Sequence, residues 1–368
     1  MGARPGGVSP VARKDMRLVE VITMSRSTRE TVLDVLDDND LDYTVSDRTD
    51  DPETSATVSF PVPANAVEPI QTELANLDLG ADMYTVVVEP ETVTSERLGP
   101  SDDRFEQVEG LGHQGISRGE LHSKAADLIP DPAIYSLLTA VSAVVATGGV
   151  MLESVSVLVG AMVIAPLIGP PMATSVATVI DDQKLFVRSL KFQALGAAVA
   201  VASAVGFALV VKTTHLVPTG IDLEAVLGLS NYTASSFLLV VVALSAGFAG
   251  AISLSTSANI GLVGVMIAAA MIPPLGVVGV GIAWGRPTAV VGSMAVVLLN
   301  VLSINLAAII CLWYLGYHPR SWSELRKARS TMLRRAVVLA AAVVALVTFL
   351  AHLASGSLAD LIAVVPDP

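Results

Sequence analysis

Two contrasting patterns of apolar and polar residues divide the chain. Between residues 16 and 95, short apolar runs alternate with polar, turn-rich stretches, whereas residues 133–354 contain long apolar segments separated by polar connections. Short alternating runs are typical of strands and amphipathic helices in a small soluble domain. Long apolar segments are typical of membrane-crossing helices, which need about 20 mainly apolar residues each. We therefore expect a soluble domain followed by an α-helical, polytopic membrane domain.

The soluble pattern predicts six elements in the order β-α-β-β-α-β. Strands are expected in MRLVEVITM (16–24), LDYTVSD (41–47), SATVSFPVP (55–63) and MYTVVVEP (83–90), and helices in STRETVLDVLDDND (27–40) and NAVEPIQTELANLDL (65–79). This order is that of the ferredoxin-like α+β fold, in which two helices cover one face of a four-stranded sheet. Because that fold hosts many functions, it does not indicate one by itself.

Polar segments flank the two domains. Residues 1–15 are expected to form a disordered extension, and they contain no apolar core of the kind that a signal peptide has. Residues 96–132 are predicted to be a linker that ends in a short amphipathic helix at the membrane surface. The apolar face of this helix consists of Leu121, Ala125, Leu128 and Ile129. Residues 355–368 are expected to be a C-terminal tail.

Seven segments are long and apolar enough to cross a membrane. They are residues 133–152, 155–180, 190–211, 236–254, 260–283, 288–315 and 335–353. If the N-terminus lies inside, nine of the eleven Lys and Arg residues beyond residue 132 are inside. The positive-inside rule therefore predicts a multi-pass protein of the cell membrane, with the soluble domain in the cytoplasm and the C-terminus outside. The same rule favours a complete crossing by residues 155–180.

Proline pairs occur in the second and the fifth of these segments. VGAMVIAPLIGPPMATSV begins at Val159, and VGVMIAAAMIPPLGVVGV begins at Val263. Both share Val-Gly-x-Met followed by Pro-Pro. The match predicts two related halves of three spans each, which an odd number of crossings places in opposite orientations, plus one further span. Chance similarity between two segments rich in Ala, Val and Gly is the alternative.

Proline removes a backbone donor and clashes with the preceding helical turn. In lipid, each carbonyl left without a donor costs several kcal/mol unless another group satisfies it. We therefore predict that both helices are broken and that their ends face a shared polar site at mid-membrane. The candidate residues are Pro166, Gly169, Pro170, Pro171, Pro273, Pro274, Asn300 and Asn305, with Glu153 and Asn259 as secondary candidates. The alternative is a pair of simple kinks filled by packing of small residues.

The two asparagines lie in VLLNVLSINLAAII, the sixth segment. Asn300 is expected to reach the carbonyls that the prolines leave without donors. Asn305 is five residues farther on and therefore points elsewhere on the helix. Contact between helices is the alternative role for both. A site of this kind has no permanent charge, so we expect it to favour neutral solutes or weakly held ions.

The composition limits which binding partners and which kinds of chemistry we expect of the protein. The first 132 residues contain 26 acidic and 11 basic residues, and the remainder contain 8 and 11. An acidic domain repels nucleic acid, so we expect as partners the lipid bilayer, a small solute or ion, and further copies of the chain. The five histidines lack metal-ligand spacing, Cys311 is the single cysteine, and no phosphate-loop or triad pattern occurs. We therefore expect no cofactor, no metal and no enzymatic activity.

Three stretches resemble a known family. ESVSVLVGAMVIAPLIGPPMA, AAAMIPPLGVVGVGIA and the opening MRLVEV with TVLDVLDDNDLDY are similar to the domain-of-unknown-function 389 family of prokaryotic hydrophobic membrane proteins. The resemblance covers about residues 16–317. It implies the membrane architecture, and it implies no substrate because the family has no established activity. It also implies that related chains begin near Met16.

Two classes of function remain the main alternatives. The repeat and the paired proline segments favour a transporter or channel for a small solute or ion. The ferredoxin-like domain favours a membrane-anchored sensor or scaffold, in which that domain binds a ligand or partner. An intramembrane enzyme would need a catalytic set that the sequence does not indicate.

Overall fold

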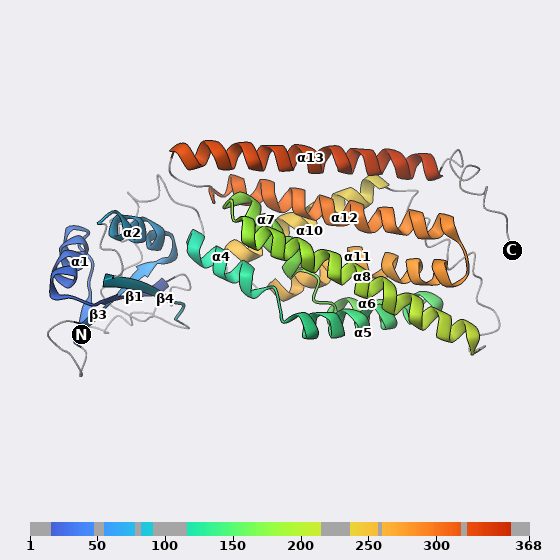
Figure 1. Cartoon of the computed structure of the whole chain (residues 1–368), viewed down its shortest axis with the longest axis horizontal. Coiled ribbons are helices and arrows are strands. Elements are labelled where there is room, and N and C mark those ends of the chain that lie inside the picture. The colour runs from blue at the N-terminus through green and yellow to red at the C-terminus, as the bar shows by residue number, and fades with distance from the viewer. Residues whose placement is uncertain are drawn as a thin grey trace, which may run out of the picture. The chain divides into compact units, whose positions relative to one another are not determined.

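A computed structural model of the chain describes residues 16–47, 55–77, 82–90, 116–214, 236–256, 260–317 and 322–354. The chain divides into two units, Met1–Gly119 and Glu120–Pro368. Strands occur in the first unit, whereas the second is built of helices (Figure 1). The division separates the predicted soluble domain from all seven predicted spans.

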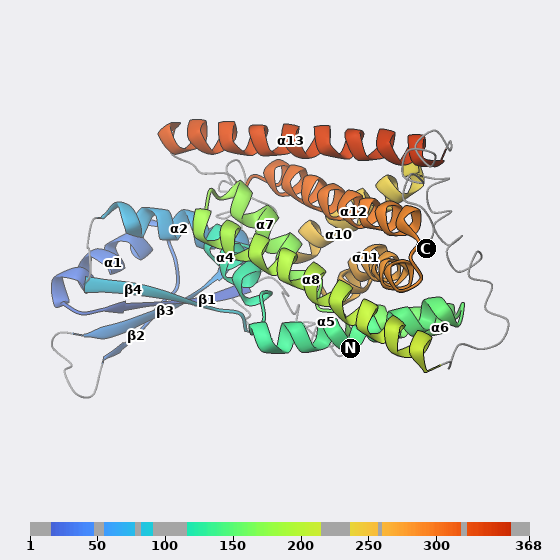
Figure 2. The same ribbon diagram turned by 45° about the vertical axis from the view of Figure 1, so that its right-hand side comes forward.

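The first unit has the predicted order of elements. It contains β1 (Met16–Thr23), α1 (Arg26–Asp38), β2 (Thr44–Asp47), β3 (Ala56–Pro63), α2 (Ala64–Asn76) and β4 (Met83–Val88). The sheet order is β2-β3-β1-β4, and every neighbouring pair is antiparallel. Both helices lie on one face of the sheet (Figure 2). Val21, Val58 and Phe60 on that face are fully buried against Leu36 and Val67 of the helices.

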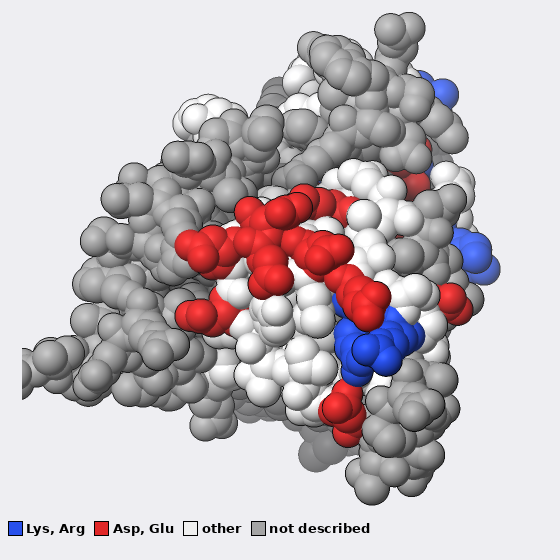
Figure 3. All heavy atoms as spheres, turned by 90° about the vertical axis from the view of Figure 1, so that its left-hand side faces the viewer, with Lys and Arg blue, Asp and Glu red and all other residues white. Residues whose placement is uncertain are grey.

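Acidic side chains gather on a face of this unit (Figure 3). The exposed acids of the second half of α1 and of the four residues after it are Asp34, Asp37, Asp38, Asp40 and Asp42. Their proximity follows from the helix, in which residues three and four apart share a face. The location agrees with the acidic balance of the first 132 residues.

The second unit is a bundle of long helices. Its elements are α4 (Arg118–Asp127), α5 (Pro132–Met151), α6 (Val155–Ile164), α7 (Gly169–Val179), α8 (Gln183–Thr213), α10 (Ser236–Ser255), α11 (Ile260–Ala283), α12 (Pro287–Tyr314) and α13 (Trp322–Ala354). Of the described helices, α5, α8, α10, α11, α12 and α13 are long and apolar enough to cross a membrane, and α6 with α7 would make a seventh span. These helices indicate a polytopic membrane protein.

Helices α11 and α12 form the centre of the bundle, because 72% of the apolar window of each is buried, against 11% for α13. Small residues allow the central helices to approach their neighbours closely. Gly276 of α11 packs against Ala146 of α5, and Gly279 packs against Ala204 of α8. α13 is peripheral and packs on α12 through Val343 and Leu350.

The predicted interruption of residues 155–180 is present. Helices α6 and α7 are bent by 51° at a four-residue break. Ala165 has an extended backbone, as expected for a residue before a proline. Pro170 and Pro171 occupy the first turn of α7, where a missing N–H costs no helical hydrogen bond. α6 and α7 lie toward opposite ends of the bundle (Figures 1 and 2).

The prediction of a second break, at Pro273 and Pro274, is wrong. α11 is one helix from Ile260 to Ala283 and contains both prolines. Pro274 has no N–H to donate to the carbonyl of Ala270, its helical partner four residues earlier. Asn300 of α12 donates from Nδ2 to that carbonyl instead. A side chain of a neighbouring helix thus replaces the lost donor, and the helix stays continuous.

Candidate functional site

Polar side chains inside the second unit gather around α7, the second half of the interrupted span. Every residue of α7 is buried, including Thr174, Ser175 and Thr178. A buried hydroxyl that lacks a partner is costly in an apolar environment, so each of these groups needs one. Their partners come from α7 itself and from three neighbouring helices.

Gln193 of α8 forms one side of this group. Its Nε2 donates to Thr174 Oγ1 over 2.6 Å and lies 3.3 Å from the carbonyl O of Pro170. Thr174 Oγ1 in turn donates to the Pro170 carbonyl at 2.8 Å. The Gln193 side chain of α8 therefore hydrogen-bonds to the first turns of α7, close to the break.

Helix α12 supplies one asparagine to each proline-containing segment. Ser175 Oγ of α7 donates to Pro171 O at 3.0 Å and lies 3.2 Å from Asn305 Oδ1. Asn300, in contrast, contacts Ala270 of α11. The expectation that the two asparagines point differently is confirmed, but the shared site is not formed, because each asparagine serves a different helix.

Two further contacts stabilise the break itself. Ser142 Oγ of α5 donates to the carbonyl O of Ala161, in the last turn of α6, at 2.7 Å. Gly169 lies directly against the backbone carbonyl of Leu128, so that a Cβ at this position would collide with it. Gly169 is therefore required by close approach of the residues that follow α4, whereas Pro166 lies within the break.

A cavity of about 300 Å³ adjoins these groups. Four helices line it: α7, α8, α12 and α13. The lining residues are Thr174, Thr178, Phe186, Leu190, Gln193, Val301, Leu302, Asn305, Ile309, Arg334, Arg335, Val338 and Leu339. Of the predicted residues, Asn305 lines this cavity, whereas Pro273, Pro274 and Asn300 do not.

Arg335 brings a permanent charge to the cavity, which differs from the uncharged site that the sequence led us to expect. Its guanidinium carbon lies 3.8 Å from the centroid of the Phe186 ring, a cation–π arrangement. Its Nη1 also donates to Thr178 Oγ1 over 3.2 Å. Sequence reasoning missed Arg335 because basic residues at the end of a span are usually assigned to orientation. The spacing of Thr174 and Thr178, four apart in an apolar run, was a signal for a polar face on α7, but it does not point to Arg335.

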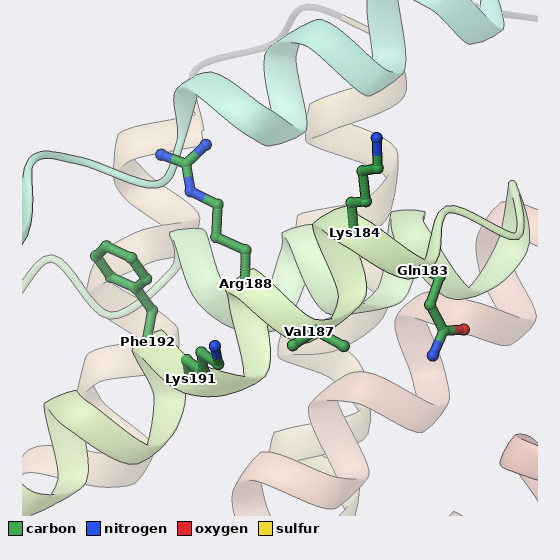
Figure 4. A pocket seen from close by; sticks show the side chains of 6 residues that line it. All are labelled: Gln183, Lys184, Val187, Arg188, Lys191 and Phe192. Carbon is green, nitrogen blue, oxygen red and sulfur yellow. The ribbon is translucent and has the colours of Figure 1, made fainter.

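A second hollow, of about 470 Å³, lies along the outside of α8. It is lined by Gln183, Lys184, Val187, Arg188, Lys191 and Phe192 (Figure 4). Lys184 and Arg188 extend to the same side of the helix in this view. Lys184, Arg188 and Lys191 are three of the nine bases that the positive-inside rule predicts on the cytoplasmic side, and this role accounts for them without a ligand.

Asp182 joins the end of α7 to the start of α8. Its carboxylate accepts from the backbone N–H groups of Lys184 and Leu185, and Oδ2 lies 2.9 Å from His122 Nε2 of α4. Partial burial would raise the pKa of Asp182, but hydrogen bonds from Leu185, His122 and Lys184 outweigh it and hold the pKa below its usual value. Asp182 is therefore the N-cap of α8.

Of the two secondary candidates, Glu153 lies apart from the cavity lining. Glu153 is exposed in the turn between α5 and α6, where its φ of 49° places it in the left-handed region. Asn259 lies outside the described residues. In the part of the chain that the structure describes, no group of three or more His, Cys, Asp or Glu side chains could hold a metal ion.

Comparison with known proteins gives two matches. The family model described as "Domain of unknown function (DUF389)" matches residues 162–306, from α6 to α12. An uncharacterized protein of Methanocaldococcus jannaschii is 31% identical over 266 residues, which are 71% of this chain and 77% of the relative. No solved structure matches the chain. The matched region includes the last three residues of α6, the break, α7, α11 and both asparagines of α12, but not Arg335.

Proposed function

Since the chain belongs to the family described as a domain of unknown function, DUF389, we propose that it moves a small solute or ion across the membrane beside its interrupted span. One observation carries the proposal: α7, the buried half of that span, presents Thr174 and Thr178 to a partly open cavity between α8, α12 and α13. Broken helices with polar groups at a cavity are the usual way in which transporters bind solutes within the membrane.

The packing of the helices supports a repeat of two halves, α5 to α8 and α10 to α12. α11, the second span of one half, packs against the first and third spans of the other, α5 and α8. The interrupted span packs in the corresponding way, with α7 contacting α12 and α10. We interpret this correspondence as an inverted repeat in which one of the two central spans is broken and the other is continuous.

We propose seven crossings, with the ferredoxin-like domain in the cytoplasm and the C-terminus outside. A bend of 51° lets α7 continue away from α6 rather than turn back beside it. Single cysteines at Ser46 and Ser357, in a Cys311→Ser background, should react with an impermeant reagent from opposite sides of the membrane. Labelling from the same side would contradict a complete crossing by α6 and α7.

Flux measurements test the proposed activity. The full-length protein would be reconstituted in liposomes, and entry of neutral solutes and of small salts would be followed by light scattering. We expect at least one class to enter faster than into protein-free liposomes. Thr174→Val, which removes a buried hydroxyl at the cavity, should lower that rate by roughly tenfold, about 1.4 kcal/mol in the barrier.

Thr256→Val is the matched control, because Thr256 is exposed directly after α10 and donates to the Ile252 carbonyl of that helix. It should transport at the rate of the unaltered protein. The proposal fails if none of the solutes enters faster than into protein-free liposomes, or if the two variants transport equally well.

A sensor or scaffold is the second candidate function. On the sheet face away from α1 and α2, Tyr84 and Val86 of β4 are exposed, and Ile22 pairs with Tyr84 across the strands. Exposed apolar residues on one face are typical of a binding surface. Slower hydrogen exchange in β4 of the full-length protein when small metabolites are added, without solute flux, would favour this function.

A further inference from the structure

The charges in the cavity of α7, α8, α12 and α13 have one sign. Among the described residues that line it, Arg334 and Arg335 are the charged ones, and both are cationic. They repel each other, and Asp181 is the acidic group that acts on Arg335. Two positive charges thus lie at the cavity, and that of the part-buried Arg335 lies beside apolar helices, where electrostatic interactions are stronger than in water. The cavity therefore attracts an anion.

The two arginines have guanidinium N–H donors that could bind an anionic group. The bond from Arg335 to Thr178 uses one of the five N–H donors that a guanidinium has. Phe186 holds the plane of the Arg335 guanidinium from one side. Arg334 is exposed and makes no hydrogen bond or ion pair with the residues that the structure describes. A guanidinium held in this way can bind a carboxylate or phosphate through two parallel hydrogen bonds.

Most of the remaining lining is apolar. Leu190 of α8, Leu302 and Ile309 of α12, and Val338 of α13 surround the space beyond the arginines. Apolar walls with a few polar groups at one place are typical of sites for small molecules, and a volume of about 300 Å³ is at the lower end of their range. The apolar surface fits a hydrocarbon chain or ring better than a fully hydrated inorganic ion.

We infer that this cavity binds an amphiphilic anion, whose carboxylate or phosphate is held by Arg335 and Arg334 and whose apolar body lies among α8, α12 and α13. The inference rests on the proposed function insofar as it names a class of solute. The same chemistry occurs in a free single-chain anion and in the headgroup of an anionic lipid, and the test distinguishes these sources.

Binding would be measured on the full-length protein in phosphatidylcholine nanodiscs by calorimetry, with decanoate as the probe and decan-1-ol as its neutral counterpart. We expect decanoate to bind at least about tenfold more tightly than the alcohol. Arg335→Gln should weaken decanoate binding by roughly tenfold or more. Arg286→Gln is the control, because Arg286 is exposed at the start of α12, outside the cavity lining.

Arg334→Gln tests the same charge without removing the packing on Phe186, so a folding failure of the Arg335 variant leaves the inference testable. Equal binding of decanoate and decan-1-ol, or unchanged decanoate binding in every folded variant of Arg334 and Arg335, would overturn it. Weaker apparent binding in nanodiscs that contain phosphatidylglycerol would identify the lipid headgroup as a ligand. Unchanged binding there would identify the free anion.

Binding and flux separate the two proposals. Decanoate binding that needs Arg335, in a protein that passes no solute, would overturn the proposed transport and leave the site established. Solute flux that depends on Thr174, without selective decanoate binding, would overturn the site and leave transport established.

Discussion

The two proline-containing segments of the membrane unit begin alike and fold differently. Both carry Val-Gly-x-Met and then a proline pair, yet α6 and α7 are separated by a bent break whereas α11 is continuous. In α11, Asn300 supplies the donor that Pro274 lacks. The first segment has a third proline, Pro166, which follows an extended residue. A proline pair alone therefore does not break a helix, and the donors available around it decide the outcome.

The contrast also shows how the two segments are supported. The break is enclosed by groups from α5 and from the end of α4, namely Ser142 and the Leu128 carbonyl. The continuous helix depends on one side chain of α12. Substitutions at these positions should thus affect the two segments separately, and they can be ranked by expected effect.

The largest effect is expected from Gly169→Ala. The added Cβ would collide with the backbone carbonyl of Leu128, which cannot move as a side-chain tip can. We expect a loss of about 3 kcal/mol in the free energy of unfolding. The measurement is equilibrium unfolding in mixed detergent micelles.

Gly160→Ala and Gly264→Ala are the controls, one in each proline-containing segment. A Cβ at Gly160 meets nothing within 4 Å, and one at Gly264 makes ordinary contacts with Ile168 at 3.5 Å or more. Both should be neutral or slightly stabilising, because alanine favours helix more than glycine does. A Gly169 variant as stable as these controls would show that α4 does not enclose the break.

The next effect is expected from Asn300→Leu. The substitution leaves the part-buried Ala270 carbonyl without its side-chain donor, which should cost about 2 kcal/mol. In a Pro274→Ala background residue 274 regains its N–H, so the same substitution should cost less. A double-mutant cycle of unfolding free energies measures this coupling. Additive effects would mean that Asn300 does not replace the donor that proline removes.

Ser142→Ala should lower the free energy of unfolding by less, about 1 kcal/mol. The substitution removes one donor to the Ala161 carbonyl, but this carbonyl still accepts from the N–H of Ala165. Ser136→Ala is the control on the same helix, since Ser136 is only partly buried and donates to the Pro132 carbonyl of its own helix. Unfolding free energies of the two variants would be compared. Equal stability would indicate that α5 does not support the end of α6.

The smallest effect concerns the charge at the end of α7. Because folding lowers the pKa of Asp182, its contribution to stability is complete above the usual value of 3.8 and is lost as the pH falls through the lower folded pKa. The contribution should be at most about 1 kcal/mol, since both side chains of the Asp182–His122 pair are partly exposed.

Asp182→Asn removes this charge and keeps a good helix cap. The stability difference between the unaltered protein and this variant, measured from about pH 6 to pH 3, should shrink toward the acid end. A difference that is constant across this range would contradict a lowered pKa.

Local sequence patterns were sufficient to predict most of the helices and strands. The strands and helices of the first unit follow the predicted order, since alternation and turn residues act over a few neighbours. Likewise, every predicted span coincides with a helix or with the α6–α7 pair. The state of α11 could not be predicted from local sequence, because its missing donor comes from Asn300, 30 positions away from Ala270.

The candidate site could be predicted only in part. Asn305, Gly169 and Pro170 were identified from the cost of unpaired polar groups in lipid, and the structure places all three on or against α7. Arg335 could not be assigned to the site from sequence. It reaches Thr178 from a helix more than 150 positions away, and only the packing of α13 brings them together.

The peripheral position of α13 has a consequence for biosynthesis. This helix follows all the other helices that the structure describes, and its residues are the least enclosed of the six long apolar ones. A growing chain folds its earlier parts first, so α5 to α12 assemble while the wall that carries Arg334 and Arg335 is still being made. The cavity is therefore completed only after α13 has been made and has packed, and occupancy by an anion would distinguish chains with a packed α13 from chains without one.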